Sequence, residues 1–473
     1  MAEIQHVIVL MLENRSFDSM LGWLYPNRPG FAGLNGTQSN SCLNTSYKVS
    51  TTPPANADAN TVPTPDPGET FTDITEQLYG SANGRGAAPP PMSGFAKNYF
   101  GQATGTAHYD PAAVMHSYTD AEIPVLWRLA QDFAVSDQWF AAAPCQTWPN
   151  RFFTHCGTCH GIVNNSDFTS GLHVPFTAPS IFRVLENAGH SWRVYFHDVP
   201  QSLLLRDIED LAPLRYRFFN QFLADAAQGA LPHYSFIEPH YFGEFFSAQP
   251  PNDQHPPHDV RYGEQLTADV YHAVRQSPCW QNTLLIITYD EHGGCYDHIA
   301  PPAAVPPDGL GPPGYNFNSY GVRVPAVIIS PWIAPGAVLQ PMTDQKQPHG
   351  GTAYPFDHTS IMKTISELFA LPAAQLTPRA AAAPSLLPYL TLPAPTNNGP
   401  YFLQTPRLTP TRPEINAMAA ELPNDLHKAL GEGMEILHSG IATIGHDIGE
   451  AAETVAQIGA RAVAQVRAFL GAL

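Results

Sequence analysis

The sequence is short of charged residues and lacks any long apolar run. Only 14% of the 473 residues are charged, with 23 Lys and Arg against 41 Asp and Glu, so the formal net charge is −18. This acidic balance argues against nucleic-acid binding and against attraction to an anionic membrane through a basic patch. Because charge is scarce, much of the surface must be neutral and polar, proline-rich, or covered by a partner.

Cysteine is also scarce. The six cysteines are too widely spaced in so long a chain to define a disulfide framework. Cys156-Gly-Thr-Cys159-His160 matches the attachment pattern of c-type haem, but no other haem signal accompanies it. We therefore favour a structural role for these thiols, or one disulfide. No run of about 18 uncharged apolar residues predicts an ordinary transmembrane span.

The remaining sequence contains enough apolar residues, 44%, for a substantial core. Strand patterns alternate with helix patterns over residues 6–371, which indicates an α/β fold with a mainly parallel sheet. The clearest strands are expected at 6–12, 233–240, 283–289 and 323–331, and the clearest helices at 123–134, 151–159, 262–275 and 357–371.

The most informative stretch is residues 283–298. An apolar run ends at Tyr289 and is followed at once by Asp290, Glu291, His292 and two glycines. In open α/β sheets, ligands collect beyond the carboxyl ends of such strands. Two adjacent carboxylates ionise together in a partly buried pocket only beside a cation, so this stretch predicts a metal site. A solvated acidic turn is the alternative.

The first strand, residues 6–12, ends in the same way. It runs directly into Glu13 and Asn14, and a carboxylate followed by an amide can offer two hard oxygen ligands on one turn. Asn14 or Ser16 can also serve as the N-cap of a following helix, and both interpretations can hold together.

Thr147 lies on a loop just before the helix expected at 151–159. Backbone N–H groups at a helix N-terminus favour anions and lower the pKa of a hydroxyl, so this position suits a nucleophile that attacks phosphorus. Plain N-capping by Thr147 is the alternative.

Other polar residues also qualify as candidates. His255 and His258 are flanked by aspartates and stiffened by prolines, and they can line a phosphate or a metal, although surface loops often have this composition. His197 follows the strand expected before it, and we count it as a candidate substrate-binding residue. We expect residues 28–98 to form an irregular insertion, in which the segment around Glu69 makes an ordered return to the site.

The C-terminal part differs in composition. Residues 372–413 are rich in Pro and Ala, which predicts a linker or an extended strap, and residues 414–473 show the spacing of an amphipathic helix or helical hairpin. Glycines within this segment suit close helix–helix or bilayer contact. Docking on the catalytic domain (residues 1–371) or homo-oligomerisation is favoured over lipid contact.

Four of these motifs, in this order, resemble those of the bacterial phospholipase C and acid phosphatase A family, which includes plant non-specific phospholipases C. The resemblance covers roughly residues 5–371 and rests on Glu13-Asn14-Arg15-Ser16-Phe17-Asp18, Thr147-Trp148-Pro149-Asn150-Arg151, His255-Pro256-Pro257-His258-Asp259 and Asp290-Glu291-His292-Gly293-Gly294.

This resemblance implies an alkaline-phosphatase-like three-layer α/β/α sandwich and a phosphoric ester hydrolase. It implies one divalent metal ion held by Glu13, Asn14, Asp290 and Glu291, next to Thr147 as the nucleophile. Hard oxygen ligands suit Ca, Mg or Mn, and Zn or Fe stays open. His255 or His258 could protonate the leaving oxygen, and Asn14 could also bind a phosphate oxygen.

The favoured hypothesis is cleavage of phospholipid to diacylglycerol. The alternative is a broad acid phosphatase, and the third hypothesis is a non-catalytic scaffold. The chain departs from the resemblance at Glu69, where family members often carry His. Family members are usually exported, but residues 1–6 lack the basic and apolar regions of an export signal. We therefore expect a signal-independent route or a cytoplasmic location.

Overall fold

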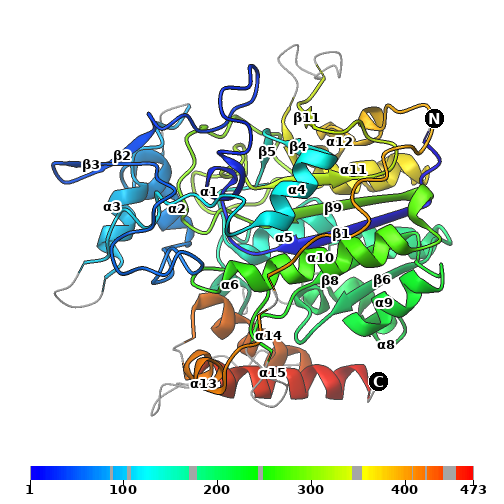
Figure 1. Ribbon diagram of the computed structural model, residues 1–473. Helices are drawn as coiled ribbons and strands as arrows, with labels where there is room; N and C mark the ends of the chain where they lie inside the picture. The colour runs from blue at the N-terminus through cyan, green and yellow to red at the C-terminus, as the bar shows by residue number, and fades with distance from the viewer. Residues whose placement is uncertain are drawn as a thin grey trace.

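The computed structural model describes residues 2–85, 89–103, 108–169, 178–242, 249–342, 354–406, 408–420, 423–439 and 454–471. Within these residues, the core is an eight-stranded sheet with the order β11-β4-β10-β9-β1-β8-β6-β7 (Figure 1). Its strands are β1 (His6–Leu12), β4 (Ala134–Ser136), β6 (Trp192–Phe196), β7 (Tyr216–Phe218), β8 (Tyr234–Glu238), β9 (Thr283–Tyr289), β10 (Ala326–Ile329) and β11 (Ala337–Leu339).

The sheet is parallel except at β10, which pairs antiparallel with both β9 and β4. The two central strands, β1 and β9, are apolar and buried almost throughout, as expected for strands covered on both faces. The predicted mainly parallel α/β sheet is therefore confirmed.

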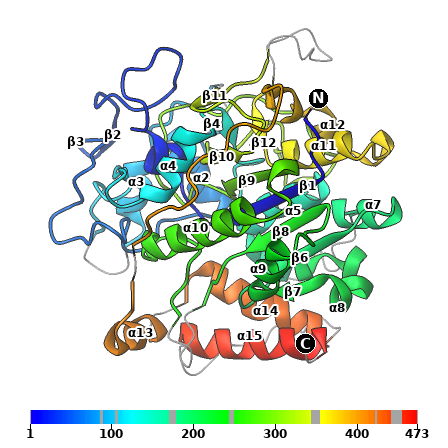
Figure 2. The same ribbon diagram turned by 45° about the vertical axis from the view of Figure 1, so that its right-hand side comes forward.

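Helices cover both faces of the sheet (Figures 1 and 2). On one face α10 packs against its neighbours α4 and α9, and on the other α5 packs against α7 and α11. These helices are α4 (Pro124–Asp132), α9 (Phe219–Ala227) and α10 (Val260–Gln276), then α5 (Thr147–Cys156), α7 (Ile181–Asn187) and α11 (Thr359–Leu368). The layers are completed by the shorter helices α1 (Phe17–Leu21), α6 (Asn165–Thr169), α8 (Ala212–Arg215) and α12 (Pro378–Ala382).

The insertion at 28–98 contains some regular elements that were not predicted. They are the hairpin β2 (Ser39–Cys42) and β3 (Thr45–Lys48), the helix α2 (Phe71–Tyr79) and the start of the helix α3 (Phe95–Gly101). The insertion has an apolar cluster of its own, which includes Val62, Ile74, Leu78, Phe95 and Tyr99. These elements were missed because the apolar residues are spread thinly between prolines and glycines, and only the fold brings them together.

The C-terminal helices α13 (Arg412–Ala419), α14 (Asp425–Ser439) and α15 (Val455–Leu470) lie together at the bottom of the molecule in both views (Figures 1 and 2). α14 packs on α15 and also contacts α6 and the short helix Gln201–Leu204 of the catalytic domain. Within the amphipathic segment expected at 414–473, residues 440–453 lie outside the described residues. Among the described helices, none is both long enough and apolar enough to span a membrane.

The segment that leads to these helices packs on the catalytic domain. Arg379 and Leu386 are fully buried, and Arg379 forms an ion pair with Asp357. Residues of this segment are therefore buried against the catalytic domain, and the linker or strap at 372–413 stays a prediction. All six cysteines are buried free thiols, so the alternative of a disulfide at Cys156 or Cys159 is wrong.

Candidate active site

The register of the two central strands brings the first candidate residues together. β1 and β9 run parallel, with Leu12 opposite Tyr289. Glu13 and Asp290 are the next residues of each strand, so they leave the sheet side by side at its carboxyl edge. Both side chains are fully buried, and a buried carboxylate requires a partner.

The turn after β1 is tight and aims the side chain of Asn14. Asn14 has a φ of 54°, which asparagine tolerates better than most residues, and its N–H donates to Asp290 Oδ1 over 3.1 Å. Gly293 packs against this turn, where a Cβ would lie only 2.2 Å from the Asn14 carbonyl oxygen. The glycine after His292 is therefore required by the close approach of two backbones.

Thr147 brings its hydroxyl to the same point from α5. Its Oγ1 lies 3.3 Å from Glu13 Oε2 and 3.2 Å from Asn14 Oδ1. Thr147 is the first helical residue and the N-cap is Gln146, so N-capping by Thr147 is ruled out as the explanation of this threonine. The hydroxyl instead faces the tips of the sheet, where the positive end of the helix dipole favours negative charge.

Arg151 connects the two carboxylates. It lies one helical turn after Thr147, and its Nη2 and Nε donate to Glu13 Oε1 over 2.5 Å and to Asp290 Oδ2 over 3.0 Å. Residues four apart on a helix share a face, so α5 presents a hydroxyl and a guanidinium to the same carboxylates. Gln201 Nε2 is a second donor to Glu13 Oε1, over 2.8 Å.

The charges at this edge do not balance. Burial raises the pKa of Glu13 well above its usual range, and Asp290 and Asp253 raise it further against the opposing effect of Arg151 and His255. Burial likewise raises the pKa of Glu291, helped by Glu69 and Asp290. The pocket therefore has more carboxylates than cations, which is the environment that favours binding of an additional cation.

His255 reaches the centre from the loop before α10. Its Nε2 lies 2.9 Å from Asn14 Nδ2, and the same amide nitrogen donates to Glu69 Oε1 over 2.7 Å. Burial alone would lower the pKa of His255, but the nearby carboxylates of Asp66 and Glu69 raise it well above its usual value. The segment around Glu69 does return to the site, as expected.

His258 lies further from Thr147 than His255 does. Its Nδ1 is 2.6 Å from Asp253 Oδ1, and the same oxygen accepts the N–H of His255 over 3.0 Å. One buried carboxylate therefore holds both histidines, whose ring centres are 5.9 Å apart.

His197 lies apart from this cluster in the described hydrogen bonds. Its Nδ1 bonds to the carbonyl of Glu238 over 3.0 Å, and its ring stacks on Phe219 at 4.3 Å. Burial lowers its pKa to about 4. Its predicted contact with substrate stays a prediction.

The oxygen donors around Thr147 fit a hard divalent cation. Glu13 Oε2, Asn14 Oδ1 and the Thr147 hydroxyl converge, and Glu291 Oε1 is buried without a hydrogen-bond partner. Glu13, Asp290 and Glu291 do not themselves form a set of three whose ligand oxygens all lie within 4.8 Å of one another. Among the described residues, Asp66, Glu69 and His255 do form such a set, directly beside Asn14.

Sequence reasoning assigned no role to several of these residues. Arg151 could have been found, since its spacing of four from Thr147 places it on the same helix face. Asp253 could also have been found, since it lies two residues before His255 in the sequence. Glu238, which lies 3.9 Å from Arg151, could also have been found, because it ends the strand expected at 233–240. Gln201 carries no such signal, because only the folded chain brings it here.

Comparison with known proteins identifies the family. The model of the Phosphoesterase family matches residues 4–372. The chain belongs to the phosphoesterase family. The predicted enzyme class, a phosphoric ester hydrolase, is thereby confirmed, and the scaffold reading is set aside.

Curated relatives of this phosphoesterase come from plants and bacteria. It is 37% identical to non-specific phospholipase C4 of Arabidopsis thaliana, over 89% of this chain and 78% of that protein. It is 39% identical to non-specific phospholipase C1 of the same plant, over 80% and 69%. Phospholipase C B of Mycobacterium tuberculosis is 26% identical, over 86% and 81%.

Solved structures resemble the chain only distantly. The lipoteichoic acid synthase LtaP of Listeria monocytogenes is 13% identical, with a TM-score of 0.34 over 56% of this chain and 69% of that one. A protein in the alkaline phosphatase superfamily from Vibrio parahaemolyticus is 13% identical, with a TM-score of 0.32 over 56% and 64%.

Proposed function

We propose that this phosphoesterase is a metal-dependent hydrolase of phospholipase C type, which cleaves phospholipid to diacylglycerol and a phosphorylated head group. The observation that carries the proposal is the position of Thr147, whose hydroxyl meets Glu13 and Asn14 while Arg151 on the same helix pairs with Glu13 and Asp290. The names of the plant and mycobacterial relatives support the same substrate class.

In the proposed reaction, Thr147 Oγ1 attacks phosphorus and the diacylglycerol oxygen leaves. Water then releases the phosphate ester from Thr147, and a two-step reaction of this kind replaces one difficult displacement by two easier ones. His255 lies beside Asn14 and is placed to donate a proton to the leaving oxygen or to hold a phosphate oxygen. His258 shares Asp253 with His255 and lies further from Thr147.

One divalent cation is proposed to bind among Glu13, Asn14, Thr147, Asp290 and Glu291. When bound, such a cation neutralises charge on the phosphoryl oxygens and lowers the pKa of a nearby hydroxyl. Arg151 pairs with Glu13 Oε1 and Asp290 Oδ2, which leaves Glu13 Oε2 facing Thr147.

A two-substrate assay tests this proposal. Purified protein is given phosphatidylcholine and, separately, p-nitrophenyl phosphate, and elemental analysis of the same sample identifies the bound metal. We expect diacylglycerol release that a chelator abolishes and that Thr147→Ala reduces by about 10³-fold or more. Monoester turnover without diacylglycerol release would favour the acid phosphatase alternative, and unchanged hydrolysis by Thr147→Ala would refute the mechanism.

A further inference from the structure

The peptide that joins Asp290 to Glu291 has a hydrogen-bond partner from a distant part of the chain. His358 Nε2 lies 2.5 Å from the Asp290 carbonyl oxygen, and both residues are fully buried. His358 is the N-cap residue of α11 and directly follows the strand β12 (Phe356–Asp357). The proposed reaction gives this histidine no part.

Trp139 determines which nitrogen of His358 carries the proton. The indole Nε1 of Trp139 lies 3.3 Å from His358 Nδ1. An indole N–H can only donate, so Nδ1 is the acceptor and the proton of the neutral ring lies on Nε2. His358 therefore donates to the Asp290 carbonyl oxygen, and its ring is fixed at both nitrogens.

Trp139 is itself held by a short pair of strands. The strand β5 (Trp139–Phe140) pairs parallel with β12, and Trp139 is opposite Phe356. The rings of Trp139 and Phe356 also stack, with centres 5.8 Å apart. The partner that fixes the tautomer of His358 is therefore anchored in the same pair of strands that leads to His358.

Asp290 is held at its other polar atoms too. Its N–H donates to the Leu12 carbonyl, Oδ1 accepts the N–H of Asn14, and Oδ2 accepts Arg151 Nε. Loss of the His358 donor would leave the Asp290 carbonyl buried without this partner, which is unfavourable. The peptide would then rotate towards another donor and displace the side chain of Asp290.

Glu291 lies on the other side of the same peptide. Its Oε1 is buried without a hydrogen-bond partner, whereas Oε2 accepts the N–H of Gly293 over 2.9 Å and lies 3.0 Å from His292 Nδ1. Both of these partners belong to the same turn as Glu291 and would move with it. A donor from outside the turn, such as His358, is therefore needed to fix where Glu291 leaves the sheet.

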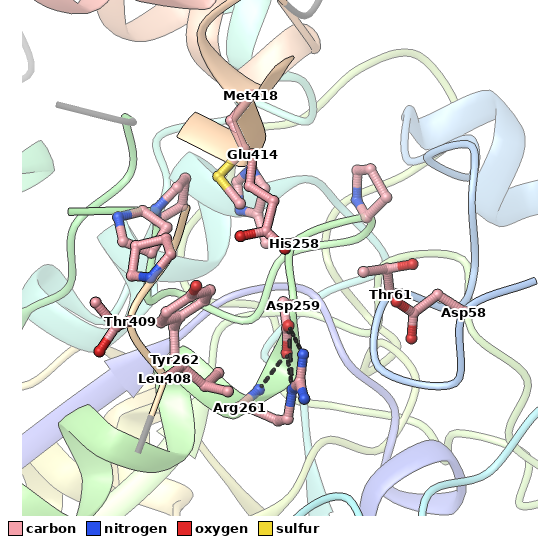
Figure 3. A pocket seen from close by; sticks show the side chains of 14 residues that line it. Asp58, Thr61, His258, Asp259, Arg261, Tyr262, Leu408, Thr409, Glu414 and Met418 are labelled. Atoms are coloured by element: carbon pink, nitrogen blue, oxygen red, sulfur yellow. Dashed lines mark hydrogen bonds and ion pairs between the residues drawn. The ribbon is translucent and has the colours of Figure 1, made fainter. Parts of the chain in front are cut away.

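Direct contact with substrate does not explain His358. His258 borders a pocket of about 280 Å³, together with Glu414 and Met418 of α13 (Figure 3). His358 is not among the described residues that line this pocket, and its exposed fraction is 0%. Since both of its ring nitrogens are already bonded, His358 can act on the reaction only through Asp290 and Glu291.

Arg379 of α12 holds the residue next to His358. Its Nη1 lies 3.3 Å from Asp357 Oδ2. The same Nη1 donates over 2.6 Å to the carbonyl of Ala142, in the loop before α5, and the guanidinium lies 5.4 Å from the ring centre of Phe153 on α5. Arg379 therefore ties the turn that carries His358 to the helix that carries the proposed nucleophile.

We propose that His358 is a positioning residue for hydrolysis, which fixes the peptide between Asp290 and Glu291, and that Arg379 keeps His358 in place. The inference rests on the proposed function, because it concerns two proposed ligands of the cation. Arg379 lies outside residues 4–372, the part that matches the family model. The catalytic unit of this chain therefore extends into its C-terminal segment.

Two substitutions of His358 each keep one of its two hydrogen bonds. In His358→Gln, the amide nitrogen lies close to the position of the imidazole Nε2 and still donates to Asp290. In His358→Asn, the amide oxygen lies close to the position of Nδ1 and still accepts from Trp139, but no donor reaches Asp290. A histidine with a merely structural role would respond alike to the two changes.

Binding of Mn²⁺ to the metal-free, full-length protein provides a readout that does not require turnover. The ion suits hard oxygen ligands, and its free form is followed by electron paramagnetic resonance. We expect His358→Asn to weaken Mn²⁺ binding about tenfold or more, as is usual when a metal ligand loses its outer partner, and His358→Gln to weaken it less than about threefold. Urea unfolding of the metal-free variants checks that both are folded.

Arg379→Lys acts on His358 without altering it. Lysine keeps a positive charge beside Asp357, but it lacks the fork of donors with which the guanidinium reaches several acceptors. We expect Arg379→Lys to weaken Mn²⁺ binding about threefold and to add little to His358→Asn in the double variant, because residues that act through one path are not additive. Full additivity would show that Arg379 does not act through His358.

The possible outcomes separate this inference from the proposed function. Equal weakening of Mn²⁺ binding in His358→Gln and His358→Asn would overturn the positioning role and leave the Thr147 chemistry intact. Weakening in His358→Asn alone, without diacylglycerol release by the wild type, would support the positioning role and refute the phospholipase activity. A wild type that binds no Mn²⁺ and contains no metal would overturn both.

Discussion

The sheet edge around Thr147 and the C-terminal helices α14 and α15 contact each other, but they are built from opposite kinds of residues. At the sheet edge, fully buried Glu13 and Asp290 are held by Arg151. Where α14 and α15 meet the catalytic domain, close apolar contacts predominate: a Cβ on Gly433 would lie 3.0 Å from Trp148, and one on Gly459 would lie 2.8 Å from Phe242.

This difference shows how the two regions tolerate change. A buried ion pair costs much to assemble and more to break, because removal of one partner leaves the other charge uncompensated. A close helix contact without charges responds to volume instead, since cores accept neither cavities nor extra methyl groups without strain. Charge substitutions should therefore dominate at the sheet edge, and size substitutions should dominate in the tail.

The largest effect is expected for Arg151→Met. This change leaves Glu13 and Asp290 buried beside each other without their guanidinium, which should cost about 3–5 kcal/mol of unfolding free energy and abolish measurable hydrolysis. Urea unfolding and the phospholipid assay measure both effects.

Arg128→Met is the control for Arg151→Met, because Arg128 is mostly exposed and pairs only with Asp132 on its own helix. It should cost less than about 1 kcal/mol. Similar losses in the two variants would mean that the buried position of Arg151 has no special importance.

An intermediate effect is expected for Gly433→Val. Its side chain would press on Trp148, the residue after Thr147, and on Leu204. We expect a loss of about 1–3 kcal/mol from overpacking and a fall in kcat of about tenfold, because a small displacement of the nucleophile is costly. Thermal unfolding and steady-state kinetics provide the readouts.

Gly431→Val is matched to it on the same helix. A Cβ at Gly431 would meet Ile458 of α15 at 2.7 Å and does not approach Trp148. We expect a comparable loss of stability with little change in kcat. If both variants lost activity equally, the tail would act on the site only through overall stability.

The smallest effect is expected at a buried carboxylate that lies outside both regions. Glu264 of α10 accepts the N–H groups of Val125 and Leu126, and burial raises its pKa to about 8. An unfolded glutamate has a pKa of about 4.3. Between this pH and pH 8, the folded state therefore retains a proton that the unfolded state has lost. The stability that this proton provides is present at low pH and is lost as the pH rises towards 8.

Glu264→Gln removes this titration and keeps an acceptor for the two N–H groups. The melting temperature of the wild type relative to this variant should therefore fall by a few degrees between pH 5 and pH 8.5. A difference that does not change with pH would show that Glu264 is ionised in the folded protein throughout this range.

The sequence predicted the site better than its surroundings, for identifiable reasons. The position of the sheet edge could be predicted because Glu13 and Asp290 each directly follow a buried strand. In α/β sheets the ligand groups lie at such strand ends. The close-packing role of glycines in the tail was also predictable from their spacing. The parallel register of β1 and β9, which places the two acids side by side, could be guessed only after the fold class was known.

Other contacts were beyond prediction because they depend on long-range packing. Glu69 reaches Asn14 from an insertion whose helices were missed, and Gln201 reaches Glu13 across 188 residues. The first residue of α5 was also placed four residues too late, at 151 instead of Thr147. That shift is decisive, since Thr147 as the first helical residue points its hydroxyl at Glu13 instead of at its own backbone.

The most direct test of the account is a search for a covalent phosphocholine adduct on Thr147. The protein is mixed with phosphatidylcholine, quenched in acid within milliseconds, digested and analysed by mass spectrometry. Because diacylglycerol is the group that leaves in the first step, the account predicts a peptide that carries phosphocholine on Thr147, appears before steady state and is missing from Thr147→Ala. An adduct on another residue, or rapid turnover with no modified peptide at any quench time, would contradict it.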